Sequence, residues 1–144
     1  CDRRQRQMCI RDRYKRGVFA LDTALFLHDL TDRTPHKFHM AFPYGYNTSS
    51  PKAAGILCSC KKEPYYSLGI ALVDTPAGNT VRAYNAEKTL CEILKPISHT
   101  DIQIITDAFK RYAGRKDKNI PLLSEYAHQL RVEKRLRPYL EVLL

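Results

Sequence analysis

The chain divides into a first half with strand-like patterns of hydrophobic and polar residues and a second half with helical spacing. In the first half, residues 36–43 alternate polar and apolar side chains, and residues 55–58 and 68–73 form short apolar runs. Residues 75–79 contain a proline and a glycine suited to a tight turn, and residues 80–84 return as a partner strand. Strands joined by such short turns predict an antiparallel sheet.

From residue 86 onward, apolar residues recur every three or four positions, a spacing typical of helices that bury one face. The expected helix starts and ends are Asn85, Pro96, Thr100 with Gln103 as a capping box, Gly114, and Asn119 with Pro121. The expected core positions of these helices are Ala86, Leu90, Cys91, Ile93, Leu94, Ile102, Ile105, Phe109, Tyr112, Leu122, Leu123, Tyr126, Ala127, Leu130, Leu136, Tyr139, Leu140 and Leu143.

A short helix followed by a turn is predicted within residues 22–35, where apolar residues again recur at helical spacing. Asp22 or Thr23 is expected to cap its first turn, because both side chains offer an oxygen to free backbone N–H groups. Pro35 lacks an N–H group and is expected to end the segment. Together these elements predict an α+β fold: an antiparallel sheet flanked by several helices, with an all-helical C-terminal part.

Residues 1–16 are expected to be foreign to the fold. Residues 8–12 match the translation of a transposon end used in common sequencing libraries, and residues 14–16 match the same DNA in another frame. The alternative is a natural basic arm that binds nucleic acid. This segment holds seven basic and two acidic residues, so it carries +5 of the net charge of +9 and leaves +4 for residues 17–144. So mild a charge is weak evidence for nucleic-acid binding.

No membrane segment, metal site or cofactor site is expected in the rest of the chain. The longest early apolar run, residues 18–21, ends at an aspartate, which fits neither a signal peptide nor a membrane span. Cys58 and Cys60 have no second ligand pair, and in a strand His36 and His39 would point to opposite faces. The odd number of cysteines beyond residue 16 suits a reducing cytoplasm.

Several motifs occur in one order along residues 17–144. The first covers residues 23–35 and 43–49, the second residues 81–94, and the last residues 126–132 and 139–144. In this order they resemble the AbiEi-type antitoxins, which pair with nucleotidyltransferase toxins in bacterial abortive-infection systems. The matching positions are Thr23, His28, Asp32, Arg33, Pro35, Glu87, Lys88, Thr89, Tyr126, Tyr139 and Glu141. Glu92 is a departure, because the family often has Asp there.

The resemblance implies a cytoplasmic antitoxin that neutralises a cognate nucleotidyltransferase toxin, directly or indirectly, and represses its own operon. The family carries an N-terminal winged helix that binds operator DNA, and residues 17–144 correspond to the C-terminal, antitoxin-bearing half. Contact with operator DNA is therefore expected mainly through that missing N-terminal domain. The resemblance implies no enzymatic activity and no cofactor.

A metal-dependent nuclease is the first alternative function. It would need a strand-borne Asp followed by an acidic-x-Lys element. Asp74 follows a strong strand, but residues 81–83 offer neither an acid nor a lysine. The sequence therefore predicts no catalytic residue and no metal ligand.

A plain DNA-binding module is the second alternative, because residues 101–144 hold nine basic and six acidic residues. Arg111 and Arg115 are four positions apart, and Lys134 and Arg137 are three apart, so each pair shares one helix face. These four residues are the predicted surface for a partner protein or for nucleic acid. Their alternative role is a solvated helix face.

Overall fold

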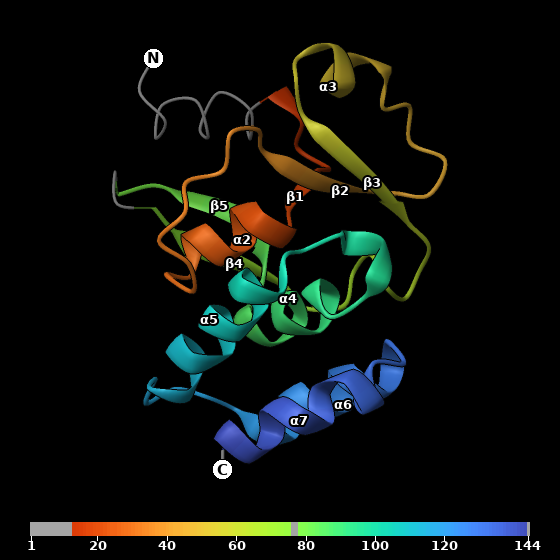
Figure 1. Ribbon diagram of the computed structural model, residues 1–144. Coiled ribbons are helices and arrows are strands. Elements are labelled where there is room, and N and C mark those ends of the chain that lie inside the picture. Colours follow the sequence, from red (N-terminus) through yellow and green to blue (C-terminus); the bar gives the residue numbers. More distant parts are fainter. Residues whose placement is uncertain (1–12, 76–77, 144) are drawn as a thin grey trace.

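The computed structural model describes residues 13–75 and 78–143, apart from the side chains of residues 142 and 143. The strands are β1 Val18–Phe19, β2 His39–Pro43, β3 Leu57–Lys61, β4 Ile70–Asp74 and β5 Thr80–Tyr84. The helices are α2 Leu21–Leu27, α3 Ser49–Ala53, α4 Ala86–Ile93, the 3-10 turn η1 Pro96–Ser98, α5 Ile102–Ala113, α6 Ile120–Gln129 and α7 Glu133–Leu143. The sheet lies at one end of the molecule and helices α6 and α7 at the other, which is the predicted α+β class (Figure 1).

The five-stranded sheet is mixed, which corrects the expectation of an antiparallel sheet. Its strand order is β3-β2-β1-β5-β4. Strands β4 and β5 pair antiparallel across the predicted turn, as do β1 and β2, but β2 pairs with β3 and β1 with β5 in parallel. Residues 76–77 of that turn lie outside the described residues. The parallel pairing of β2 and β3 arises because the connection through α3 carries the chain back before β3 begins.

Both faces of the sheet are covered by apolar packing. Phe19, Met40 and Phe42 lie on one face in a buried cluster that also contains Tyr14, which is only 5% exposed. The hydroxyl of Tyr14 is 3.1 Å from Ser50 Oγ, on helix α3. Tyr14 falls within the segment predicted to be foreign to the fold, and it packs as part of the core.

The N-terminus of α2 differs from the prediction. The helix begins at Leu21, and its N-cap residue Ala20 makes no side-chain capping bond. Thr23 is buried inside the helix, and its Oγ1 accepts a hydrogen bond of 2.9 Å from the backbone N–H of His39. Neither Asp22 nor Thr23 is therefore the cap, and the Thr23 hydroxyl instead joins α2 to the start of β2.

Two of the three predicted caps in the second half are confirmed. Asn85 accepts a bond from the N–H of Lys88 at the start of α4, and Asn119 accepts one from Leu122 at the start of α6. The predicted capping box at Thr100 is wrong, because the cap of α5 is Asp101. The neighbouring Asp carboxylate accepts the bond that was assigned to the Thr100 hydroxyl.

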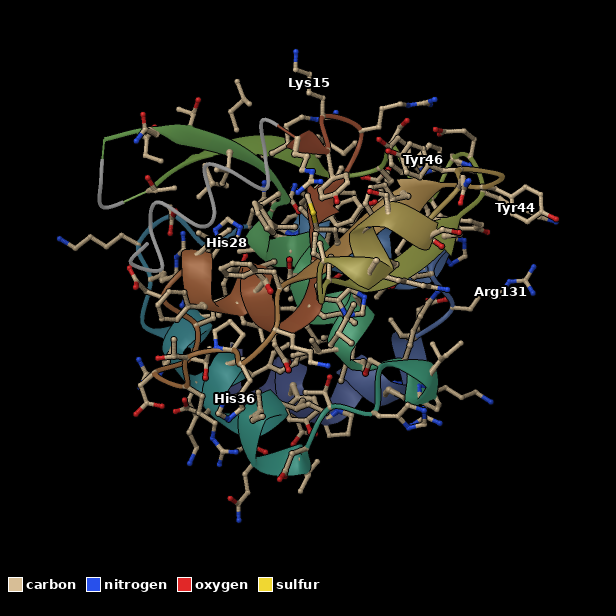
Figure 2. All side chains as sticks on the ribbon, turned by 90° about the horizontal axis from the view of Figure 1, so that it is seen from above. Lys15, His28, His36, Tyr44, Tyr46 and Arg131 are labelled. Atoms are coloured by element: carbon tan, nitrogen blue, oxygen red, sulfur yellow. The ribbon has the colours of Figure 1, made fainter. Side chains whose placement is uncertain are left out.

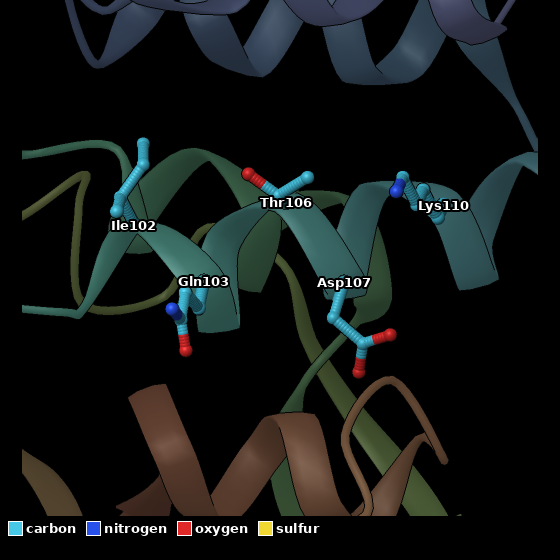
Figure 3. A pocket seen from close by; sticks show the side chains of 5 residues that line it. All are labelled: Ile102, Gln103, Thr106, Asp107 and Lys110. Atoms are coloured by element: carbon cyan, nitrogen blue, oxygen red, sulfur yellow. The ribbon is translucent and has the colours of Figure 1, made fainter.

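Among the described side chains, the helical core follows the predicted spacing except at Ile102. Ile105, Phe109 and Tyr112 are buried on α5, but Ile102 is 63% exposed. Ile102 instead borders a shallow surface pocket of about 300 Å³ on α5 (Figure 3). Helix α7 packs against α5, where the ring of Tyr139 stacks on Phe109 with 4.4 Å between centroids. In the described ranges, no helix has the length and apolar character to cross a membrane.

Candidate functional site

Several residues of the family-like motifs meet where β5 turns into α4; we call this the β5–α4 junction, Tyr84 to Thr89. His28 Nε2 donates to the carbonyl of Tyr84 at 2.8 Å, which fixes the neutral ring with its proton on Nε2. Burial lowers the pKa of His28 and favours the same neutral form. The hydroxyl of Thr89 donates to Asn85 O at 2.8 Å, and Asn85 Nδ2 donates to Tyr126 Oη at 3.2 Å.

The same junction reaches α5 and α6 through Glu87. Tyr112 donates its hydroxyl proton to Glu87 Oε2 at 2.6 Å, and its oxygen accepts the backbone N–H of Asn119 at 2.7 Å. Arg115 Nη1 donates to His28 O at 3.3 Å, which links the end of α5 to the end of α2. The junction therefore joins four helices to strand β5 through side chains that are distant in sequence.

Within this junction, the side chain of Lys88 is fully buried. Its Nζ donates to the carbonyls of Tyr65 and Leu68 at 2.9 and 3.1 Å and lies 3.7 Å from the ring centroid of Tyr84. Gly69 has φ +82, and a Cβ atom there would lie 2.8 Å from Lys88 Cβ, so a side chain at this position is excluded. Burial lowers the pKa of Lys88 to about 8, although the negative charge of Glu92 acts to raise it.

Glu92 holds two ammonium groups on one buried carboxylate. Its Oε1 lies 3.1 Å from Lys61 Nζ and 3.2 Å from Lys88 Nζ. Its Oε2 accepts a bond from Lys61 at 3.2 Å. Burial raises the pKa of Glu92, but Lys61 and Lys88 outweigh it, so the net shift is downward. The three residues form a buried ion cluster between β3 and α4.

A groove of about 770 Å³ runs along the edge strand β3, and we call it the β3 groove. Its lining includes Lys37, His39, Lys52, Leu57, Ser59, Lys61 and Ile97. His39 Nε2 and Ser59 Oγ share a hydrogen bond of 2.5 Å. Burial, aided by the charge of Lys61, lowers the pKa of His39 to about 4, so its ring is neutral at pH 7.

The sequence did not indicate this groove. His39 and Ser59 meet because β2 and β3 pair in parallel with Ala41 opposite Ser59, and that register involves no local turn. The sequence indicates that Leu57, Ser59 and Lys61 point to the same face of a strand. It does not indicate which residues of other strands lie beside them. His36 precedes strand β2 and lines a separate pocket of about 440 Å³, together with Arg33 and Pro35.

The four basic residues predicted to bind a partner fall into two groups. Arg111 pairs with Asp107 at 2.9 Å and lies 3.9 Å from Asp32, and Arg115 makes a two-bond contact with Asp117. Their charge is therefore largely balanced. The acidic partners, four residues before Arg111 and two after Arg115, are visible in the sequence.

Lys134 and Arg137 are exposed on α7 and make no ion pair within the described part of the chain. Lys134 lines a pocket of about 650 Å³ with Arg131 and Arg135. We call Arg131, Lys134, Arg135 and Arg137 the basic corner. Arg131 extends away from the body of the molecule (Figure 2). Glu141, the last motif residue, is also exposed on α7.

The acidic residue considered for metal-dependent chemistry is Asp74, and it is exposed at the end of β4. Cys58, Cys60 and Cys91 are free thiols. Within residues 13–75 and 78–143, no group of three or more His, Cys, Asp and Glu side chains is placed to share a metal ion.

No protein-family model matches the chain, and no curated protein matches it either. The likeness to AbiEi-type antitoxins therefore depends on the motif residues themselves. Of these, His28, Glu87, Thr89 and Tyr126 meet at the β5–α4 junction, whereas Glu141 is distant from it in sequence and exposed.

Proposed function

We propose that the chain is the antitoxin domain of an AbiEi-like protein and that it neutralises a cognate nucleotidyltransferase toxin by binding it in the cytoplasm. The observation that carries the proposal is the meeting of motif residues at the β5–α4 junction. His28, Glu87 and Tyr126 come from segments far apart in sequence, and each makes a specific polar contact there. Their meeting in one place supports the proposal, because the motif residues are scattered along the sequence.

A binding role fits the polar contacts of these residues better than a catalytic role. Thr89 is buried, and its hydroxyl donates to the carbonyl of Asn85. Glu87 accepts the proton of Tyr112, and Lys88 lies among carbonyl groups with no exposed surface. Catalytic acids and bases need access to a substrate, whereas these groups hold the fold together.

The basic corner is the surface we assign to the toxin. Its four side chains are exposed and make no ion pairs within the described residues, unlike Arg111 and Arg115. Unpaired charges at an interface raise the association rate and select partners of opposite charge. An acidic surface on the nucleotidyltransferase is the complementary partner.

A growth assay tests the proposal. Cells that express the proposed partner, a cognate nucleotidyltransferase toxin, should regain colony formation when the chain is co-expressed. The variant Lys134→Glu with Arg137→Glu should lose rescue, while the matched reversal Lys110→Glu with Lys116→Glu should keep it. Circular dichroism and thermal midpoints establish that both variants fold. Absence of rescue by the unchanged chain would refute the antitoxin role, and rescue by both variants would refute the assigned surface.

DNA binding by the basic corner is the second candidate function, because the same unpaired charges suit phosphate groups. The chain would then bind operator and scrambled duplexes equally, with a steep loss of affinity as salt rises. Fluorescence anisotropy with both duplexes measures this. If Lys134→Glu with Arg137→Glu abolishes DNA binding but still rescues growth, DNA binding and the antitoxin role are separate functions.

A further inference from the structure

The β3 groove lies apart from the basic corner, and none of the motif residues lines it. It follows an edge strand, and alternation along β3 turns Leu57, Ser59 and Lys61 toward the same face of the sheet. His39 stands opposite Leu57 in the register, so its side chain lies on that face as well. Polar and apolar side chains therefore line the same groove.

The charges of the groove favour an anion. Lys37 and Lys52 are exposed, and neither makes an ion pair within the described residues. Lys61 is held in place by Glu92 and keeps 19% of its side chain exposed. Two carboxylates, Asp22 and Glu92, also line the groove. The charge of Glu92 is balanced by Lys61 and Lys88, so Asp22 is the carboxylate that opposes Lys37 and Lys52.

The His39–Ser59 pair supplies a neutral hydrogen-bond donor at the same place. A neutral imidazole carries one N–H group, and a hydroxyl carries one O–H group. Only one of these two hydrogens lies in the bond between Nε2 and Oγ. The hydrogen that remains outside this bond is the Ser59 hydroxyl proton when Nε2 carries the ring proton, and the His39 Nδ1–H in the other tautomer. Ammonium groups combined with neutral donors suit the several acceptor oxygens of a phosphate.

Two exposed aliphatic side chains complete the groove. Leu57 is 48% exposed and Ile97 is 81% exposed, although both are large hydrophobic residues. A volume of about 770 Å³ exceeds what a phosphate alone would fill and falls in the usual range for small-molecule sites. We propose that the β3 groove binds a nucleotide, with its phosphate held by Lys37, Lys52 and the His39–Ser59 pair and its base against Leu57 and Ile97.

This inference does not depend on the antitoxin proposal, because it concerns the chain alone. Isothermal titration with adenosine monophosphate, adenosine and inorganic phosphate tests it directly. The monophosphate should bind at least about tenfold more tightly than either of the other two probes, because only it engages the cations and the apolar walls together. Equal binding of all three probes, or no binding of the monophosphate, would overturn the inference.

Matched variants locate the site. Lys37→Ala with Lys52→Ala should weaken binding of the monophosphate by about tenfold or more, since two attractive charges are lost. Lys110→Ala with Lys116→Ala removes the same charge from the exposed surface of α5 and the loop after it, and should change affinity less than about twofold. Equal losses in the two variants would show diffuse attraction instead of a site. Thermal midpoints establish that both variants fold.

The phosphate could belong to a free nucleotide or to an RNA strand, and competition separates the two sources. A single-stranded RNA of about ten nucleotides that displaces the monophosphate from the unchanged chain, but not measurably from the Lys37→Ala/Lys52→Ala variant, identifies the strand as the ligand. An RNA that binds without displacing the monophosphate identifies the free nucleotide as the occupant. Displacement that is equally effective in the double variant would overturn the inference, because the strand would then bind elsewhere.

Discussion

Glu92 shows how a single side chain can decide whether buried charges are tolerated. Lys88 has no exposed surface, and its ammonium group has Glu92 as its counter-charge at 3.2 Å. A buried ion pair adds little net stability, but removal of one partner leaves a desolvated charge. Glu92 is therefore a residue on which the fold depends.

Glu92→Gln should reduce the free energy of unfolding by about 3–5 kcal/mol, because Lys88 would remain buried without a counter-charge. Urea denaturation followed by circular dichroism measures the change. Glu125→Gln, at an exposed position on α6, is the control and should change stability by less than about 0.5 kcal/mol. A loss below about 1 kcal/mol in Glu92→Gln would show that Lys88 is accommodated without Glu92.

His39 should make the fold sensitive to acid. Burial lowers its pKa from 6.5 to about 4, so as the pH falls the unfolded chain takes up the proton first. Stability from neutral His39 is complete above pH 6.5 and is lost between pH 6.5 and pH 4, by up to about 3 kcal/mol. Two charged groups face His39: Lys61 lowers its pKa further, and Glu92 raises it.

Thermal midpoints measured from pH 7 to pH 4.5 should therefore fall more steeply for the unchanged chain than for His39→Gln, which cannot take up that proton. A residual slope is expected in the variant, because burial also lowers the pKa of His28. Identical slopes would mean that His39 is not buried as a neutral ring in solution.

At the scale of elements, α7 depends on a few contacts with the helical core. Leu136 is 1% exposed, whereas Leu140 is only partly buried. The side chain of Leu143, also predicted as core, lies outside the described side chains. Leu136→Ala should cost about 2–5 kcal/mol of unfolding free energy, through lost transfer energy and a cavity, and Leu140→Ala should cost less. Chemical denaturation measures both, and the reverse order would contradict this docking of α7.

Helix boundaries could be predicted where a local signal decided them. Asn85 and Asn119 act as caps through their own side chains, so sequence was sufficient. The start of α2 was missed because Leu21 enters the helix at φ +50, a conformation that its sequence does not indicate. The turn between β4 and β5 was sufficient to predict that these two strands pair. The two-residue strand β1 lies in the middle of the sheet because it pairs with β2 and with β5, which is distant in sequence.

In the candidate site too, features set by local sequence could be predicted and contacts between distant segments could not. The sequence marked Lys134 and Arg137 as one exposed face because helical spacing is local. It could not show that Arg115 reaches the carbonyl of His28, or that His39 meets Ser59 across two strands. Those contacts depend on strand register and on helix packing, which no short motif encodes.

At the scale of the whole molecule, the fold extends further toward the N-terminus than the predicted boundary after residue 16. Tyr14 lies in the sheet core, and Arg82 Nη1 donates to the carbonyl of Lys15 at 2.7 Å. The hydroxyl of Tyr66 donates to Arg16 O at 2.5 Å. Deletion of residues 1–16 would therefore remove a core side chain.

Tyr14→Ala should lower the free energy of unfolding by about 3 kcal/mol, because it empties a buried aromatic site. Tyr44→Ala removes the same side chain from a position that is 70% exposed and should cost less than about 0.5 kcal/mol. Denaturant titration of the two variants compares them. Equal, small effects would show that the fold begins after residue 16.

The most direct test of the antitoxin account is the affinity of the purified chain for the proposed partner, a cognate nucleotidyltransferase, measured by isothermal titration calorimetry. The account predicts a complex with a Kd of about 1 μM or tighter at low salt. Lys134→Glu with Arg137→Glu should weaken it at least about tenfold, and Lys110→Glu with Lys116→Glu less than about twofold. A folded chain that gives no binding signal with the folded toxin would contradict neutralisation by direct contact.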